Sequence, residues 1–387
     1  MTEITLMQVD ADLARLNQYN LALEGFQRVM EGREVITGPT AMAMRIALED
    51  AEVDQSVDQG ITGKDLVAGF KKVAITVRNI IQWLLRTIGK LVETIGLAMQ
   101  KLGDVGRKQK VALKAVPEQV KTELPKAKVE PSSFDPSFLS IAGEFAGHDV
   151  EQLNNMLKMV QFASNDYPVQ FDHVLADLEQ LARTAISSKA DSTDAFFNGL
   201  GQSLQKNIKI PQMKYSNTNH MPHMSSNSVS TVNTVPLLGD QGLTMLDPQD
   251  AVAVLSKSNP ISALQGYLLI KFGEYDTSVE GEVEVKSPDY PTLVKLNEIC
   301  IQAAETWNEA DKSNLSKISS RVEKIKGLLD DMAKGEQSPA LNTIASAMGV
   351  VLQRMTDPLM NIQKWVSRTL KAELSYIQQC VDAAEQE

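Results

Sequence analysis

The sequence is poor in the residues that support disulfide frameworks, turn-rich β folds and membrane spans. Only two of its 387 residues are cysteines, Cys300 and Cys380. Both fall in helical apolar patterns, which favours reduced, buried thiols. Aromatic residues make up 5% of the chain, and its 22 glycines and 15 prolines are few for a protein of this length. No secretory signal begins the sequence, and no apolar run reaches the roughly 20 residues of a spanning helix. We therefore expect a soluble, mainly helical protein made in a reducing compartment.

Recognisable catalytic motifs are missing as well. Residues 60–65 (Gly-Ile-Thr-Gly-Lys-Asp) approach a phosphate loop, but the glycine spacing is wrong and Asp65 replaces the hydroxyl residue that would hold magnesium. His220 and His223 stand beside two methionines in a soft-metal pattern, yet their Ser/Asn-rich surroundings offer no third strong ligand. We expect no catalytic residue, no cofactor, no metal site and no small-molecule substrate.

Charge is distributed unevenly along the chain, whose net charge is −11. Residues 1–63 carry 4 basic and 11 acidic side chains, a net of −7. Residues 64–128 carry 14 basic and 5 acidic side chains, a net of +9, and the remainder has a net of −13. The total argues against a protein that coats nucleic acid over its whole surface, whereas the basic middle segment could meet an anionic partner.

The strongest apolar pattern lies in this basic segment and predicts one amphipathic helix over 64–103. Its stripe steps by three and four residues throughout: Phe70, Val73, Val77, Ile80, Leu84, Ile88, Leu91, Ile95, Ala98 and Leu102. Basic residues off the stripe form a candidate face for DNA or a protein partner: Lys71, Lys72, Arg78, Arg86, Lys90 and Lys101. Such a helix can pack in an intramolecular bundle, lie on a membrane or partner, or bind duplex phosphates. The pattern leaves all three open.

Pattern and composition divide the chain into four regions. For residues 1–106, the pattern predicts an acidic helical hairpin followed by the long basic helix. Residues 107–136, with spaced prolines and many lysines, predict an extended linker. Residues 137–290 predict a mixed helical region, and residues 291–387 an antiparallel helical hairpin with arms of about 40 residues.

Finer features are expected inside the last two regions. The Ser/Asn-rich stretch at 207–240 predicts a long loop, and 262–273 continues a helical pattern. The alternation of valine and glutamate at 278–286 predicts a small strand or hairpin. Pro291 and Ser338-Pro339 each open a helix, and Pro358 kinks or breaks one. The predicted fold class is mainly α: a long-helix bundle with a Pro/Lys-rich linker and at most a short β-hairpin.

The order of elements in the N-terminal third carries a family resemblance. An acidic helix containing 21–25 precedes a Thr-Gly-Pro turn and an Ala/Met/Leu helix within 36–49, and the basic helix follows through 66–86. Over roughly residues 10–110 this order resembles the internal head (inner body) proteins of phiKZ-like giant bacteriophages. The resemblance implies packaging with the genome inside the capsid and trimming by a phage protease after a small-x-Glu sequence. Four glutamates end such a sequence here: Glu24, Glu49, Glu144 and Glu280.

The expected function follows from this architecture and resemblance. We expect a structural, non-enzymatic virion protein of the head interior, made in the host cytoplasm, that binds capsid or inner core proteins by helix packing. Non-specific contact with packaged duplex DNA and oligomerisation are further options. The alternative from another class is a helical membrane-active protein of the pore-forming toxin type. An enzyme whose site is assembled from scattered residues ranks third.

Overall fold

The computed structural model of the protein describes most of the chain after residue 96. The described residues are 35–36, 61–62, 77, 81–82, 85–86, 97–189, 192–216, 231–256, 260–267, 270–275, 283–310, 312–334 and 338–386. Most of the predicted acidic hairpin and of the predicted long basic helix lie outside them. Two short strands in the N-terminal part, β1 (Val35–Ile36) and β2 (Ile61–Thr62), pair antiparallel.

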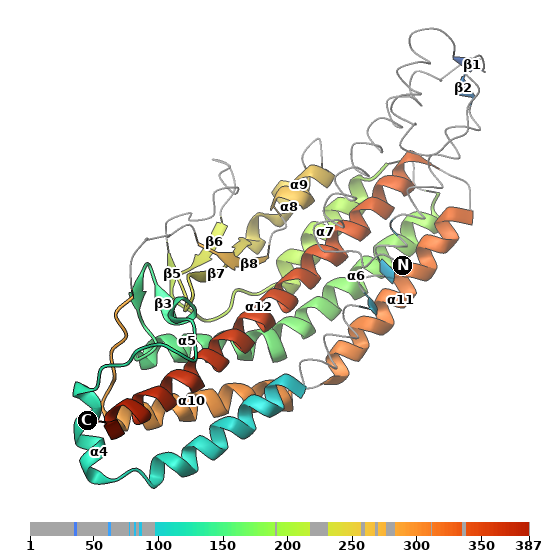
Figure 1. Ribbon diagram of the computed structural model, residues 1–387. Coiled ribbons are helices and arrows are strands. Elements are labelled where there is room, and N and C mark those ends of the chain that lie inside the picture. Colours follow the sequence, from blue (N-terminus) through green and yellow to red (C-terminus); the bar gives the residue numbers. More distant parts are fainter. Residues whose placement is uncertain are drawn as a thin grey trace.

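The longest described helix, α12 (Pro339–Gln386), runs through the described helices (Figure 1). It begins where the sequence predicted, because the Ser338 hydroxyl accepts a hydrogen bond from the Leu341 amide at 3.2 Å and proline suits a first helical turn. Between 342 and 360 nearly every side chain is buried, whichever direction it points. This all-round burial shows that other elements surround this part of α12 on every side.

Pro358 lies inside α12, and the helix does not break there as the sequence allowed. Proline lacks the amide that would bond the carbonyl of residue 354, and its ring crowds the preceding turn. The Tyr167 hydroxyl donates a 2.8 Å hydrogen bond to the neighbouring Met355 carbonyl. Tertiary packing and this bond therefore support the turn that the proline disturbs.

Two further helices run antiparallel to α12 and together form the other arm of the C-terminal hairpin (Figure 1). The sequence predicted one continuous arm, but the structure divides it into α10 (Tyr290–Glu309) and α11 (Lys312–Lys334). The division occurs at Ala310, whose ψ of 135° is extended. Asp289 caps α10 by accepting from the Thr292 amide at 2.9 Å.

A second set of helices covers α10, α11 and α12. Asp149 caps the first of them by accepting from the Glu151 amide at 2.7 Å. The set comprises α5 (Val150–Gln161), the π-helical turn η3 (Phe162–Asp166), α6 (Tyr167–Ser187) and α7 (Asp194–Asn207). The α6–α11 contact includes an ion pair between Arg321 and Asp172, whose side chains are 31% and 13% exposed. The sequence missed this polar link because its partners lie 149 residues apart.

Residues 107–136, predicted as an extended linker, are largely helical. A helix at 97–114 ends near Ala115 and is followed by α4 (Glu118–Glu123) and the 3₁₀ turn η1 (Leu124–Lys126). Two of the prolines that suggested a linker instead start these turns: Pro117 is the residue before α4, and Pro125 lies in the first turn of η1.

Strand is present in places that the sequence did not predict. A four-stranded antiparallel sheet has the order β5 (Tyr215–Ser216), β6 (Thr231–Thr234), β7 (Gln241–Leu246) and β8 (Lys271–Glu274). Part of the predicted loop at 207–240 is therefore strand, and the helical pattern at 262–273 contains the end of α9 (Pro260–Tyr267) and then β8. Within 278–286, residues 283–285 have no regular structure, Lys286 forms one isolated bridge, and the rest lies outside the described residues.

The sheet packs against α12. The Trp365 indole donates a 2.8 Å hydrogen bond to the Leu238 carbonyl, and its ring lies 5.0 Å from that of Phe272 on β8. Short elements connect the sheet to the helices: η4 (Pro248–Asp250) with α8 (Ala251–Leu255) on one side, and η2 (Pro136–Leu139) with the hairpin β3 (Ser140–Ile141)–β4 (Glu144–Phe145) on the other. The mainly α class is confirmed, with the strands short and antiparallel.

Candidate protein interface

The described part of the predicted basic face consists of two residues. Arg86 and Lys101 are both helical and exposed. The other four members, Lys71, Lys72, Arg78 and Lys90, lie outside the described residues. On the predicted stripe, Val77 is fully buried, and so is Ile81, one residue beyond the predicted position at Ile80.

The helix at 97–114 carries the C-terminal end of this basic segment, and its inner face is packed on α10 and α12 (Figure 1). Gly106 permits the close approach, because a Cβ there would lie 2.8 Å from the Ile301 side chain. Asn297 of α10 donates to the Gly106 carbonyl at 3.1 Å, and Gln109 donates to the Leu374 carbonyl of α12 at 2.9 Å. Two polar bonds and a glycine contact therefore fix both the position and the rotation of this helix.

Ion pairs border the inner face on one side. Arg107 bonds Asp104 at 2.7 Å and Glu305 of α10 at 2.8 Å, and Lys110 lies 3.0 Å from Glu298. The hydrogen bonds to Asp104 and then Glu305 raise the pKa of Arg107. These pairs are largely exposed, so they orient the helix more than they stabilise it.

The outer face of the same helix combines apolar and basic side chains. Leu97, Val105 and Val111 are 59%, 49% and 70% exposed, and Lys101 and Lys108 lie between them. We call these five residues the outer stripe. Sequence reasoning placed Lys101 on a functional face but ended the predicted helix at 103, so it missed the two valines. Continuing the count of three and four past Gly103 would have found them.

Among the candidate processing sites, Glu144 lies in described structure. It follows a tight turn in which Ala142 and Gly143 have φ values of 52° and 80°. The Ala142 amide donates to the Asp240 carboxylate at 2.7 Å, and the Phe145 ring lies 5.0 Å from that of Tyr376. A protease needs an extended, accessible segment, so cleavage after Glu144 requires this hairpin to open first. Glu24, Glu49 and Glu280 lie outside the described residues.

A buried polar cluster lies between α10 and α12 and was not anticipated. Glu373 is fully buried, and neither of its carboxylate oxygens has a hydrogen-bond partner among the described residues. Burial raises its pKa well above the usual carboxyl value. The sequence held a signal for it, because Glu373 lies three residues after Leu370 and four before Ile377, which are both on the buried face.

Both cysteines belong to this region and are free and buried, as the sequence predicted. Burial, followed by the proximity of Glu373, raises the pKa of Cys300 well above its usual value. Burial also raises the pKa of Cys380 to about 12. A thiol must ionise to act as a nucleophile, so these groups are suited to packing rather than to covalent catalysis.

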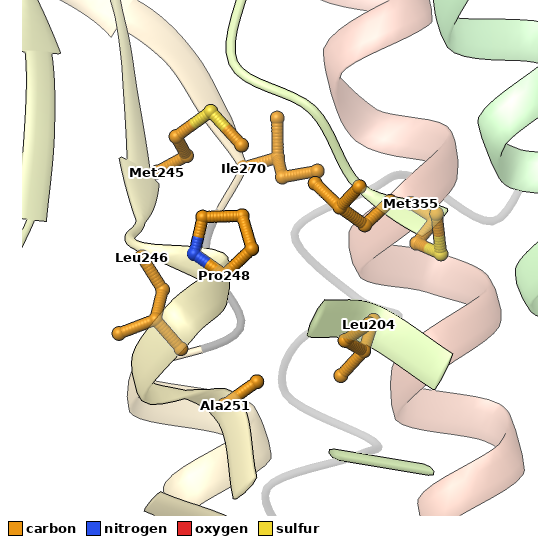
Figure 2. Close-up of a pocket in the computed structure, with 8 residues that line it drawn as sticks. Leu204, Met245, Leu246, Pro248, Ala251, Ile270 and Met355 are labelled. Carbon is orange, nitrogen blue, oxygen red and sulfur yellow. The ribbon is translucent and has the colours of Figure 1, made fainter. Parts of the chain in front are cut away.

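A small apolar cavity lies between α7, α8, the sheet and α12 (Figure 2). It encloses about 30 Å³ of free space. Apolar residues line it: Leu204, Ile208, Met245, Leu246, Pro248, Ala251, Ile270 and Met355. With room for about one water and no polar group to orient a ligand, the cavity is a gap in packing rather than a substrate site.

The described residues contain no group of three or more His, Cys, Asp or Glu side chains that could hold a metal ion. His220 and His223 lie outside the described residues. No helix in the described part of the chain has the length and apolar character needed to cross a membrane.

Comparison with known proteins assigns the chain to a family. No curated protein and no solved structure matches it. A family model described as phiKZ-like phage internal head proteins matches residues 2–379. The match extends the resemblance seen over residues 10–110 to nearly the whole sequence, and it favours a virion protein over the membrane-active alternative. The chain therefore belongs to the phiKZ-like phage internal head proteins, structural proteins of the interior of the virion head.

Proposed function

We propose that this protein is a non-enzymatic component of the head interior that binds capsid or inner core proteins by packing helix against helix. The observation that supports this most strongly is the outer stripe, an exposed apolar and basic face on a helix that Gln109 and Asn297 hold in place. The cavity between α7, α8, the sheet and α12 is too small and too apolar for substrate chemistry. A wider hollow along α5, lined by residues such as Glu151, Asn155 and Lys158, is open to solvent. A framework of long helices with functional side chains on its surface suits assembly.

Contact with packaged DNA is a second element of the proposal. Residues 64–128 carry a net charge of +9, and Arg86, which lies outside the outer stripe, is exposed within them. Contacts between lysines or arginines and phosphates release counterions, so such binding weakens steeply as salt rises. Apolar packing responds much less to salt. The two modes of attachment can therefore be separated inside one preparation of virions.

The experiment compares release of the protein from opened heads. Purified virions are opened by osmotic shock, treated with nuclease or left untreated, and sedimented at low and at high salt. We expect the protein to remain with the sedimenting protein assembly after nuclease treatment, at both salt concentrations. Complete release by nuclease alone would show that DNA holds it, and would contradict attachment by helix packing.

A further inference from the structure

We propose that the outer stripe is the docking surface for an acidic amphipathic helix of a different head protein. This inference rests on the proposed function, because it identifies the surface and the partner chemistry through which that function operates. The surface comprises Leu97, Lys101, Val105, Lys108 and Val111.

The outer stripe contains exposed apolar side chains. Four large apolar side chains are notably exposed among the described residues, and three of them belong to this one helix; the fourth is Val169 on α6, at 39%. At about 100° per residue, the five members of the stripe fall within a sector of roughly 120°, which also contains Asp104, whose carboxylate is paired with Arg107 at 2.7 Å. The opposite side of the helix holds the buried Met99, Gly106 and Leu113. The helix thus has two apolar faces, and the described residues cover only the inner one.

The positive charge of the outer stripe favours an acidic partner. Arg107 and Lys110, at the edge of the inner face, are paired with carboxylates of the same chain. Lys101 and Lys108 have no ion pair within the described residues. These two lysines lie seven residues apart, about two helical turns or roughly 10 Å. A partner helix with carboxylates at the same seven-residue spacing and apolar side chains between them would match both features.

Other ligands fit this surface less well. Phosphates of duplex DNA would pair with the lysines but would leave Val105 and Val111 facing a charged, hydrated backbone. A membrane surface is usually bound by a broad apolar face that includes aromatic residues, and the stripe has three separate aliphatic side chains. A protein helix satisfies the valines and the lysines together, since lysine stems extend an apolar surface while their charged ends meet carboxylates.

Photocrosslinking inside assembled virions tests the partner. A photoreactive phenylalanine analogue replaces Val105 or, in a second variant, Val111, and the matched control carries it at Val169. Virions are purified, irradiated and digested, and crosslinked peptides are identified by mass spectrometry. We expect both stripe positions, but not Val169, to crosslink to one segment of another virion protein that carries carboxylates seven residues apart. Crosslinks to DNA, to this chain or a second copy of it, or to no protein would overturn the proposal.

Incorporation of charge variants provides the second readout. Val105→Asp and the double variant Lys101→Glu/Lys108→Glu introduce negative charge into the stripe, and Val169→Asp is the control. All these positions are exposed, and circular dichroism melting checks that each variant folds. With each variant co-expressed with wild type, we expect the stripe variants to enter virions roughly tenfold less often, because like charges oppose docking, and the control to enter normally. Equal incorporation of all variants would refute the docking surface alone, whereas absence of the wild-type protein from virions would refute the proposed function itself.

Discussion

Replacing Glu373 with glutamine should stabilise the protein, and the gain should grow as pH rises. The carboxyl group is fully buried between α10 and α12 without a hydrogen-bond partner in the described structure. Burial favours the neutral form and raises the pKa of Glu373 well above its usual value. Glutamine keeps the shape and polarity of the neutral acid but has no proton to lose.

The sign and size of the effect follow from proton linkage. A glutamate in the unfolded chain ionises near pH 4.3, whereas the folded protein keeps its proton on Glu373 to higher pH. Above about pH 4.3, and up to the raised pKa of the folded protein, the folded state therefore binds one more proton, and this residue lowers the free energy of unfolding by about 1.4 kcal/mol per pH unit. Over that range wild type should lose stability relative to Glu373→Gln at about that rate. Below pH 4 the difference from this source should vanish.

Urea denaturation at pH 4, 5, 6 and 7 measures the difference, because every other titrating group is common to both proteins. Glu385, exposed on the same helix, provides the matched control for replacing a glutamate with glutamine. Parallel curves for wild type and Glu373→Gln would refute the reasoning. That result would mean that Glu373 is ionised in the folded protein and compensated by a group that the described residues do not provide.

Four further changes should have effects of different sign and size. Ala142→Gly should raise the free energy of unfolding by about 0.5–1 kcal/mol in urea titration, because φ at Ala142 is 52° and glycine adopts that angle freely; a loss would contradict the turn. Tyr167→Phe should lower it by about 1–2 kcal/mol, since the Met355 carbonyl near Pro358 loses its donor, and an unchanged value would show that the bond is unimportant. Asp172→Asn should lower the free energy of unfolding by about 1–2 kcal/mol at low salt, because it weakens the partly exposed ion pair with Arg321. Glu323→Gln removes a more exposed ion pair and should change this free energy by less than about 0.5 kcal/mol. Equal effects of the two substitutions would argue against the ion pair between α6 and α11. Ile81→Asp should cost more than about 3 kcal/mol and Arg86→Ala less than about 1 kcal/mol in thermal melts, because Ile81 is fully buried and Arg86 is exposed; similar melting temperatures would reverse that assignment of faces.

Local signals explain which parts of the fold were predictable. The starts of α10 and α12 follow from Asp289-Tyr-Pro291 and Ser338-Pro339, where a capping side chain and a proline act within a few residues. The buried faces of the long helices follow from spacing of three and four, which is also a local property. The family resemblance depended on the order of such local elements, and the family match confirms it.

The sheet could not be predicted because its stability is not local. The strand Thr231–Thr234 looks like part of a polar loop, and two of its side chains, Asn233 and Thr234, are buried in the sheet, where β6 pairs with β7. The end of the predicted helix at 262–273 is strand for the same reason, since Phe272 packs against Trp365 across the chain. The hydrogen bond next to Pro358 is likewise non-local, because its donor, Tyr167, lies 188 residues from its acceptor at Met355.

The candidate interface was visible only in part. Lys101 was expected on a functional face, but the prolines beyond it suggested a linker, so the helix was not followed to residue 114. Both faces of this helix contain apolar residues, and only the contacts of Gly106 and Gln109 show which face the molecule buries. The burial of Glu373 was not predicted for a related reason, because one acidic residue hardly alters a strong pattern of apolar residues spaced by three and four.

Protease protection of intact virions tests the central claim most directly. Purified particles are treated with protease before and after the heads are opened, and peptides of this chain are quantified by mass spectrometry against an exposed capsid protein. The account predicts that the protein is present in every preparation, survives protease while the head is closed and is digested once the head is open. Absence from purified virions, or removal by protease from intact particles, would contradict a place in the head interior.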